Sequence, residues 1–475
     1  MKLSRRDAMA AALFGGGMIG LRSLATGLPV KFLLNPKKAL ADMTTGCTAT
    51  NPQFVVLCTS GLGDPFACNA PGTYDDGGTG TTMNFTNLIH PSDAESGVTG
   101  IDPVQLMFGA RQYQAAGAWS NLQPWLSRTA VCHIMTDTPV HPKEPQVLQL
   151  MGATQYQEMF PSVLAKALAP CLGTLQTQPI SVGAITPSEA LTFEGQALPT
   201  IPPSALKATL TNPSGELSNA TIQGYRDDTL QKMHDWYTGG EGVTISAAQK
   251  QYLDSYITSQ QQVRGISQGM LSMLNGIGGK GTTTNGDQIT ATIALILMKV
   301  SPVIAVHFPF GGDNHSDPKF ANEAGQTVSG MQAIASLLNQ LQQSVNGVAD
   351  LTNSVSFINL NVFGRTLDKA NTAGRNHNPN HEVSMMIGSG FNGGVIGGVN
   401  APTAALGQTG GDWACMPINS TTGVPSPSGD VVPLDTLSSW AMTAMAGVGI
   451  DAATIATQIT PGKTSKVIPA ALKTS

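Results

Sequence analysis

Histidine and aspartate side chains follow several apolar segments of this 475-residue chain, at the points where those segments give way to loops. The loop residues that could ligate a metal are Asp64, His141, Asp313, His315, His377 and His381. Carboxylate oxygens and imidazole nitrogens bind hard and borderline cations. The pattern therefore predicts a site for one or two divalent ions, with Zn, Ca, Mg and Mn all open at this point.

Two arginines, Arg365 and Arg375, lie in the same stretch of sequence as His377 and His381. A guanidinium group pairs with phosphate or sulfate through two parallel hydrogen bonds. Metal ligands beside arginines predict a site for an anionic ester, in which the arginines assist catalysis by stabilising charge on the ester oxygens.

The same residue types also have structural interpretations. An Asp at a glycine-rich turn, such as Asp64, is commonly a cap, and Asn and His are ordinary in a polar surface loop such as 374–381. His133 and His307 lie inside apolar runs, so we expect them to be buried structural residues rather than ligands.

Five short apolar runs predict the strands that position these loops. They cover residues 54–59, 129–135, 303–308, 355–362 and 383–387. Most are nearly continuous, as expected for strands buried on both faces of a parallel sheet. The run 355–362 alternates more, which places it nearer a sheet edge.

Helical patterns separate the apolar runs. They cover residues 103–125, 147–169, 246–277, 288–300 and 326–347. Alternating strands and helices predict an α/β fold with a doubly wound, mostly parallel sheet, whose ligands bind at the carboxyl ends of the strands. The Pro/Thr/Ser-rich stretch at about 175–245 predicts an insertion that caps the sheet edge.

Charge is scarce and unevenly distributed. Only 12% of residues are charged, and no basic stripe suggests nucleic-acid binding. Residues 1–41 hold seven Lys and Arg against one Asp, a net charge of +6, which leaves −11 for the remainder of a chain whose total is −5. Such asymmetry marks a tail with a separate task.

The basic tail has the form of an export signal. Arg5-Arg6 precedes an apolar stretch, and Ala39-x-Ala41 matches a signal-peptidase site. The paired arginines resemble the twin-arginine signal, so we expect export by that machinery, cleavage after Ala41, and a periplasmic or secreted globule with no transmembrane helix. The alternative is a membrane anchor, although glycines interrupt the apolar run.

Six cysteines follow the expected cleavage site. An even number in an exported chain is compatible with disulfides. Cys58 and Cys132 lie in apolar runs, where a buried free thiol is the simpler expectation.

The chain resembles an exported bacterial family, domain of unknown function 1501, which is grouped with sulfatase-like proteins of the alkaline phosphatase superfamily. The matching motifs are Gly61–Asp64, His141, Gly311–His315, Phe363–Thr366 and Gly374–His377, together with the leader. The resemblance implies a single sulfatase-like domain over residues 42–475.

The chain also departs from the family pattern. Asn376 stands where that pattern has Asp, Leu367 replaces Pro, and no Cys-x-Pro-x-Arg sulfatase signature is present. The superfamily uses a Ser, Thr or modified Cys nucleophile, for which Thr59, Ser60 and Thr138 are unranked candidates.

Our leading hypothesis is a metal-dependent hydrolase of phosphate or sulfate esters. The alternative is a non-catalytic cell-envelope binding or assembly protein on the same scaffold, which Asn376 and the missing nucleophile favour. A third class, an oxidoreductase, has only the export route behind it, because no dinucleotide or Walker motif is present.

Overall fold

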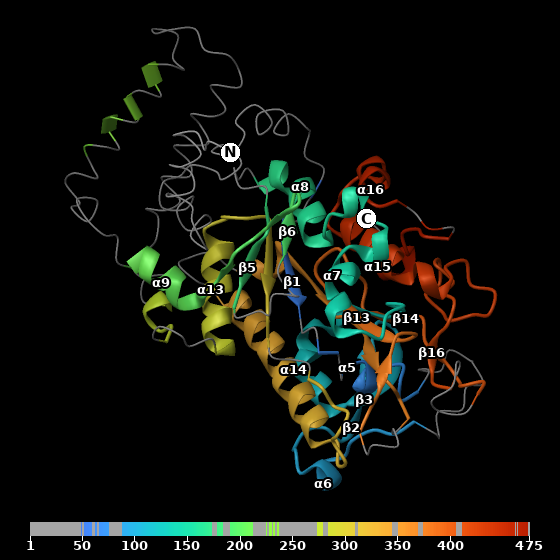
Figure 1. Ribbon diagram of the computed structural model, residues 1–475. Helices are drawn as coiled ribbons and strands as arrows, with labels where there is room; N and C mark the ends of the chain where they lie inside the picture. The colour runs from blue at the N-terminus through green and yellow to red at the C-terminus, as the bar shows by residue number, and fades with distance from the viewer. Residues whose placement is uncertain are drawn as a thin grey trace, which may run out of the picture.

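A mixed, mostly parallel eight-stranded sheet forms the centre of the fold (Figure 1). The computed structural model describes residues 52–58, 62–63, 66–75, 88–172, 178–183, 191–211, 273–278, 284–308, 312–343, 350–368, 374–404, 411–460 and 464–473, with a few single residues. The strand order is β14 (Gly394–Ile396), β4 (Thr129–Ile134), β13 (Glu382–Ile387), β10 (Val355–Leu360), β1 (Gln53–Cys58), β9 (Val303–Val306), β5 (Ile180–Val182) and β8 (Thr200–Ile201). All neighbours are parallel except β13, which runs antiparallel to both β10 and β4.

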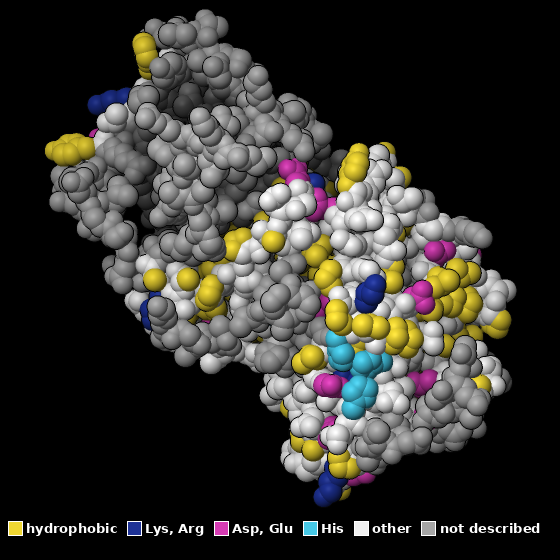
Figure 2. Space-filling view, viewed as in Figure 1, with side chains coloured by type: hydrophobic (Ala, Val, Ile, Leu, Met, Phe, Trp, Pro, Cys, Tyr) yellow, Lys and Arg dark blue, Asp and Glu magenta, His cyan; other side chains and the backbone are white. Residues whose placement is uncertain are grey.

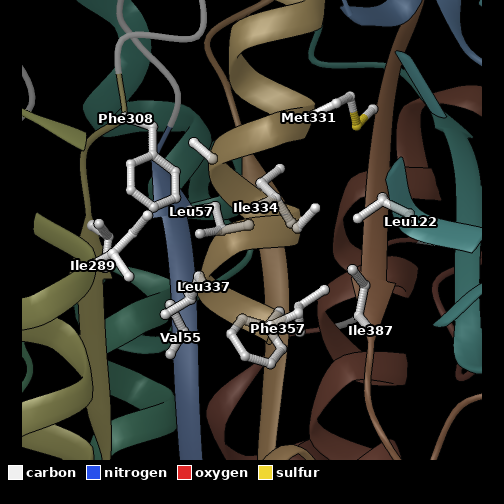
Figure 3. Packing of buried hydrophobic residues seen from close by; sticks show 14 of the residues in the cluster. Val55, Leu57, Leu122, Ile289, Phe308, Met331, Ile334, Leu337, Phe357 and Ile387 are labelled. Carbon is white, nitrogen blue, oxygen red and sulfur yellow. The ribbon is translucent and has the colours of Figure 1, made fainter. Parts of the chain in front are cut away.

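Both faces of the sheet are covered by apolar side chains. In β1, Val55 and Leu57 belong to one hydrophobic cluster, whereas Phe54 and Val56 belong to the other. Side chains alternate between the two faces of a strand, so a continuous apolar run supplies both cores. Figure 3 shows Val55 and Leu57 packing beside Leu337 on the first face.

Helices cover each face of the sheet. The first cluster includes residues of α13 (Asn285–Leu297), α14 (Ala321–Gln342) and the 3-10 helix η1 (Gly117–Arg128). The second includes residues of α8 (Phe160–Leu172) and α15 (Thr436–Gly447). The helix α13 begins with a capping box, in which the Thr284 side chain accepts from the Asp287 amide and the Asp287 carboxylate accepts from the Thr284 amide.

Smaller elements surround this frame. They are α5 (Phe66–Asn69), α6 (Asp93–Ser96), β2 (Pro103–Phe108), β3 (Arg111–Ala116), α7 (Glu144–Leu148), β6 (Thr192–Phe193), β7 (Gln196–Ala197), α9 (Pro203–Thr211), β11 (Gly364–Arg365), β12 (His377–Asn378), β15 (Val399–Asn400), β16 (Ala414–Cys415) and α16 (Ala452–Gln458), with short 3-10 turns between them.

The sequence-based expectation of an α/β fold with a mostly parallel sheet is confirmed. All five predicted strands are present as β1, β4, β9, β10 and β13, and the helices predicted over 288–300 and 326–347 are α13 and α14. The prediction that β10 lies near a sheet edge is wrong, because β10 lies between β13 and β1 with all six residues buried.

The helix predicted over 103–125 is also wrong in its first half. Residues 103–116 form the antiparallel hairpin β2–β3, turning at Gly109, whose φ is 61°. Leu106 and Phe108 are buried on alternate positions of β2, a period of two that suits a strand. The apolar residues of 103–125 thus belong to two elements, a hairpin with period two and the following 3-10 helix.

The helix predicted over 147–169 is divided into α7 and α8. Leu150, Met151, Tyr156 and Gln157 have φ between 52° and 57°, which ends an α-helix. The stretch 175–245 is not only a cap, because its described part supplies the edge strand β8 and its neighbour β5.

Several expectations fall outside the described residues. These are the leader 1–41, the helix over 246–277 except for its last residues, Asp64, and the candidate nucleophiles Thr59 and Ser60. Within the described part, Cys171 is disulfide-bonded, whereas Cys132 and Cys415 are buried thiols. No helix among the described residues is long and apolar enough to cross a membrane.

The loops that carry the candidate ligands lie at one end of the sheet, the end formed by the carboxyl ends of the parallel strands. The parallel strands β1, β4, β9 and β10 all have their carboxyl ends there. Because β13 is antiparallel, its first residue Glu382 pairs with the last residue of β4, Ile134. The connection between β10 and β13 therefore leaves from this end of the sheet and returns to it, and its described residues, 361–368 and 374–381, lie on that side.

Candidate metal centre

Four side chains converge at this edge of the sheet. His141, Asp313, His315 and His377 each offer one ligand atom, and these atoms all lie within 4.8 Å of one another. Figure 2 shows histidine side chains gathered in one patch of the surface, with an acidic side chain at its border. The Asp313 side chain is 52% exposed and that of His315 is 40% exposed, so a solute can reach the group.

Three connections that follow core strands carry the four ligands. His141 begins a 3-10 turn that follows β4, with Pro142 as its second residue. Asp313 and His315 follow β9, whereas His377 lies in β12, which pairs with β11 so that His377 faces Arg365. The sheet therefore sets the relative positions of loops that are far apart in the sequence.

The closest pair is formed by two imidazoles, since the Nε2 atoms of His315 and His377 lie 2.9 Å apart. The Nδ1 atom of each ring faces an oxygen. Asn376 Oδ1 lies 3.3 Å from His315 Nδ1, and the Pro139 carbonyl contacts His377 Nδ1. The 2.9 Å separation is that of a hydrogen bond if one of the two Nε2 atoms carries a proton, and Asp313 Oδ1 is a further acceptor 3.3 Å from His315 Nε2. If both rings carry their proton on Nδ1, the two Nε2 lone pairs and the carboxylate face one another and can share a cation.

Asp313 brings the negative charge of the group. Its Oδ1 lies 3.3 Å from His315 Nε2 and 3.4 Å from Arg365 Nη2. The same Nη2 donates to the carbonyl of Leu62 and, at 2.8 Å, to that of Gly312. Arg365 thus links the loop after β1 to the loop after β9 and holds the carboxylate of Asp313 beside the imidazoles.

Arg365 is 0% exposed, and its Nε and Nη1 atoms have no hydrogen-bond partner in the part of the chain that the structure describes. Burial lowers the pKa of Arg365, and the charge of Asp313 opposes that shift. An arginine remains protonated in proteins, so a full positive charge lies directly behind the ligand group.

An aromatic ring supports the imidazoles. The ring of Phe363 stacks on His377, with centroids 4.2 Å apart, and meets His141 at 5.0 Å. Gly63, whose φ is 91°, passes so close that a Cβ there would lie 2.4 Å from Phe363 Cε2. Glycine at this turn therefore permits both the backbone conformation and the close approach to the ring.

His377 is neutral at ordinary pH. Burial lowers its pKa to about 4, the hydrogen bond to the Pro139 carbonyl opposes this, and the charge of Arg365 adds to the lowering. A metal binds only the neutral imidazole, so this ring is ready to ligate without losing a proton.

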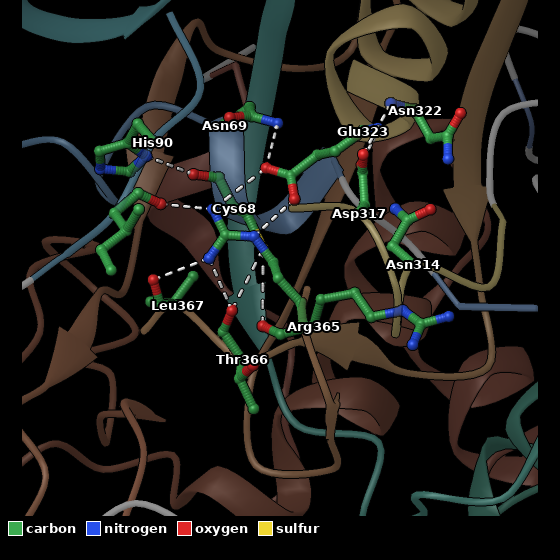
Figure 4. A network of polar contacts seen from close by, with 12 residues as sticks. Cys68, Asn69, His90, Asn314, Asp317, Asn322, Glu323, Arg365, Thr366 and Leu367 are labelled. Carbon is green, nitrogen blue, oxygen red and sulfur yellow. Dashed lines mark hydrogen bonds and ion pairs between the residues drawn. The ribbon is translucent and has the colours of Figure 1, made fainter. Parts of the chain in front are cut away.

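Arg375 does not belong to this group, which corrects its prediction as a catalytic arginine. It is 0% exposed, and its Nε lies 2.5 Å from Glu323 Oε2. Its remaining donors bond to Glu323 Oε1 and to the carbonyls of Thr366, Leu367 and Ile89. All five N–H groups of the guanidinium are thereby used. Figure 4 shows Glu323, Thr366 and Leu367 converging in this buried network, with Arg365 beside it.

His381 is likewise placed away from the ligands, contrary to its prediction as a metal ligand. It is 0% exposed, and its Nε2 lies 2.8 Å from Nδ1 of His133, which is the buried residue expected. Burial holds the pKa of His381 well below its usual range and lowers that of His133 to about 4. The two rings form a neutral pair inside the protein. Asp64, the remaining predicted ligand, lies outside the described residues.

Two contributors to the site were not recognised in the sequence. Phe363 was counted as part of a motif, but its stacking under His377 and His141 depends on a loop crossing that no local pattern reveals. Asn376 replaces an expected Asp ligand in the sequence pattern, and in the structure its side chain contacts His315 at Nδ1. The available signals were that Phe363 lies two residues before Arg365 and that Asn376 directly precedes His377.

Comparison of the chain with protein-family models, with curated proteins and with solved structures finds no match. The resemblance to the sulfatase-like family therefore rests on the motifs alone. Four predicted ligands nevertheless come together from positions up to 236 residues apart, from His141 to His377.

Proposed function

We propose that His141, Asp313, His315 and His377 hold a divalent metal ion, and that the protein is an exported metal-dependent hydrolase of phosphate or sulfate esters. One observation carries the metal proposal: the Nε2 atoms of His315 and His377 lie 2.9 Å apart, with Asp313 Oδ1 3.3 Å from the first. Two imidazole nitrogens and a carboxylate oxygen gathered in this way can ligate one cation in place of the proton that they would otherwise share.

The donor set favours zinc. Three imidazole nitrogens and one carboxylate oxygen suit a borderline ion, whereas calcium and magnesium prefer ligand shells made of oxygen. The four ion types left open by the sequence are thereby ranked, with zinc first.

The proposed chemistry follows from what surrounds the ligands. When bound, the ion would polarise the ester and offset charge on its oxygens. Arg365 would keep Asp313 in position through its Nη2 contacts and add a second positive charge behind the site. Phe363 would hold the His377 ring at a fixed angle. The exposure of Asp313 and His315 would admit the substrate from solvent.

The sulfatase-like scaffold, the twin-arginine export route and the periplasmic or secreted location belong to the same proposal. The motif order and the basic leader support them. No nucleophile is assigned. Thr138, the one candidate within the described residues, is 5% exposed, and its hydroxyl accepts from the Val140 amide at 3.4 Å.

Metal binding is tested first, with a matched pair of variants. The purified protein is saturated with zinc and freed of excess, and its metal content is measured by mass spectrometry. We expect about one ion per chain, lost in Asp313→Asn and retained in Asp102→Asn, a control of the same chemistry outside the ligand group. Trace metal in the saturated wild type would refute the proposal.

Hydrolysis is tested on the zinc-loaded protein with a panel of aryl phosphates and sulfates. We expect turnover that is abolished by His377→Ala and unaffected by Asp102→Asn.

A second candidate function is a non-catalytic envelope protein with a structural metal. Four protein ligands fill the positions of a tetrahedral ion, which is typical of structural zinc sites. Full metal occupancy without turnover of any ester, together with a large loss of stability on chelation, would favour this alternative over the hydrolase.

A further inference from the structure

Asn376 has a defined place behind the ligand group, although it is not one of the ligands. Its Oδ1 lies 3.3 Å from His315 Nδ1, the nitrogen opposite the one that faces His377. Its backbone is held on both sides by Thr366, whose amide donates to the Asn376 carbonyl and whose hydroxyl accepts from the Asn376 amide, each at 3.0 Å. These two hydrogen bonds fix the backbone from which the Asn376 side chain extends.

An acceptor at Nδ1 decides which nitrogen of His315 can ligate. With a metal on Nε2, the proton of the neutral ring is on Nδ1, where Asn376 Oδ1 accepts it, and this hydrogen bond limits rotation of the ring. The Pro139 carbonyl does the same for His377. The ring of His315 is 40% exposed, so its polar contacts matter for its orientation: His377 and Asp313 at Nε2, and Asn376 at Nδ1.

The neutrality of this amide affects the charge of the loaded site. Asp313 contributes the single negative charge among the four ligands, so a divalent ion leaves the centre with a net charge of +1. An Asp at position 376 would add a second negative charge behind the His315 ring and cancel that net charge. The whole chain is acidic, with a net charge of −5, so local positive charge is what can retain an anion.

We infer that Asn376 is a positioning residue that orients His315 for the metal while keeping the loaded centre positively charged, so that it binds an anionic oxyacid group. This inference rests on the proposed metal centre and explains why an amide, rather than a carboxylate, is useful at this position.

Two substitutions separate the two roles. Asn376→Leu removes the acceptor, and loss of such an outer-shell partner lowers metal affinity about 10- to 100-fold. Asn376→Asp keeps an acceptor, so zinc should bind as tightly as in the wild type or more tightly. The added negative charge should weaken binding of inorganic phosphate to the zinc-loaded protein about tenfold, as expected for one charge at close range in a partly exposed site.

The measurements are zinc affinity by competition with a chromophoric chelator and phosphate affinity by calorimetry at one zinc per chain. Asn400→Asp, an exposed position in β15, is the control for a surface charge change and should alter neither affinity. Nitrogen NMR of the histidines gives an independent readout, in which the His315 proton sits on Nδ1 in the wild type and is shared between the two nitrogens in Asn376→Leu.

The possible failures are distinguishable. Absence of zinc binding in the wild type overturns both the metal centre and this inference. Zinc binding that is unchanged in Asn376→Leu, or phosphate binding that is unchanged in Asn376→Asp, overturns the inference alone. Circular dichroism of each variant verifies that an exposed substitution has left the fold intact.

Discussion

The buried pair of Arg375 and Glu323 allows the sharpest test of the fold. Both side chains are 0% exposed, and two contacts join them, at 2.5 Å and 3.1 Å. Glu323 also accepts from Asn69 Nδ2 at 3.2 Å. The substitution Glu323→Gln keeps the shape of the side chain but removes the negative charge, leaving the guanidinium of Arg375 without a counterion in the interior.

The expected cost follows from this geometry. Removing one partner of a buried, hydrogen-bonded ion pair destabilises a protein by about 3–5 kcal/mol, because the remaining charge is uncompensated. The carbonyls of Thr366 and Leu367 still accept from Arg375, so we expect the lower end, about 3 kcal/mol. Such a loss is a large fraction of a total stability on the order of 5–15 kcal/mol.

The assay is urea unfolding followed by fluorescence and circular dichroism, with Glu95→Gln as the control. Glu95 is exposed, so its neutralisation should change the free energy of unfolding by less than about 0.5 kcal/mol. Replacing the pair together, as Glu323→Leu with Arg375→Met, should recover part of the loss, since an apolar pair leaves no buried charge.

A change of less than about 1 kcal/mol in Glu323→Gln would refute the assignment of Arg375 as a structural residue. So would an Arg375→Met variant that keeps the stability of the wild type and loses only anion binding. Either result would return Arg375 to the catalytic role that its sequence context suggested.

Three further predictions concern the ligand loops and the core. Gly63→Ala should lower both the stability and the zinc affinity, because a Cβ at φ 91° would lie 2.4 Å from the Phe363 ring. Backbone strain of this kind costs on the order of 1–3 kcal/mol. A variant whose zinc titration is unchanged would contradict this prediction. Burial lowers the pKa of His133 from 6.5 to about 4. Between these pH values the unfolded chain binds a proton that the folded chain does not. The free energy of unfolding should therefore fall as the pH decreases from 6.5 toward 4, by up to about 3 kcal/mol. The pH dependence of urea unfolding checks this, and a His133→Gln variant with the same slope would count against it. Zinc at 1,000 times its Kd should raise the free energy of unfolding by about 4 kcal/mol, an effect that chelation reverses and that His377→Ala abolishes; stabilisation of this variant by zinc would place the ion elsewhere.

The strands of the sheet were largely predictable from local pattern. The runs that became β1, β4 and β9 are continuous and apolar, and burial on both faces requires that composition wherever the strand lies in the sheet. Order and direction were not predictable. β13 is as apolar as its neighbours yet runs antiparallel to them, because pairing partners are set by long-range contacts that leave no trace in a single run.

The sequence predicted which loops form the candidate metal site. Carboxyl ends of parallel strands meet at one edge, so residues following β4, β9 and β10 were expected to converge, and His141, Asp313 and His315 do. The sequence could not choose between His377 and His381, which lie four residues apart in the same loop.

By itself, then, the sequence determined which functional groups are present at the ends of the buried strands: imidazoles, carboxylates and guanidinium groups. The tertiary structure decided which of them can act together. Arg365 and Arg375 are both buried, but one lies against Asp313 at the ligand group and the other is closed off by Glu323. The physical reason is that the role of a charged side chain depends on the groups around it, and these come from loops that only the folded sheet brings together.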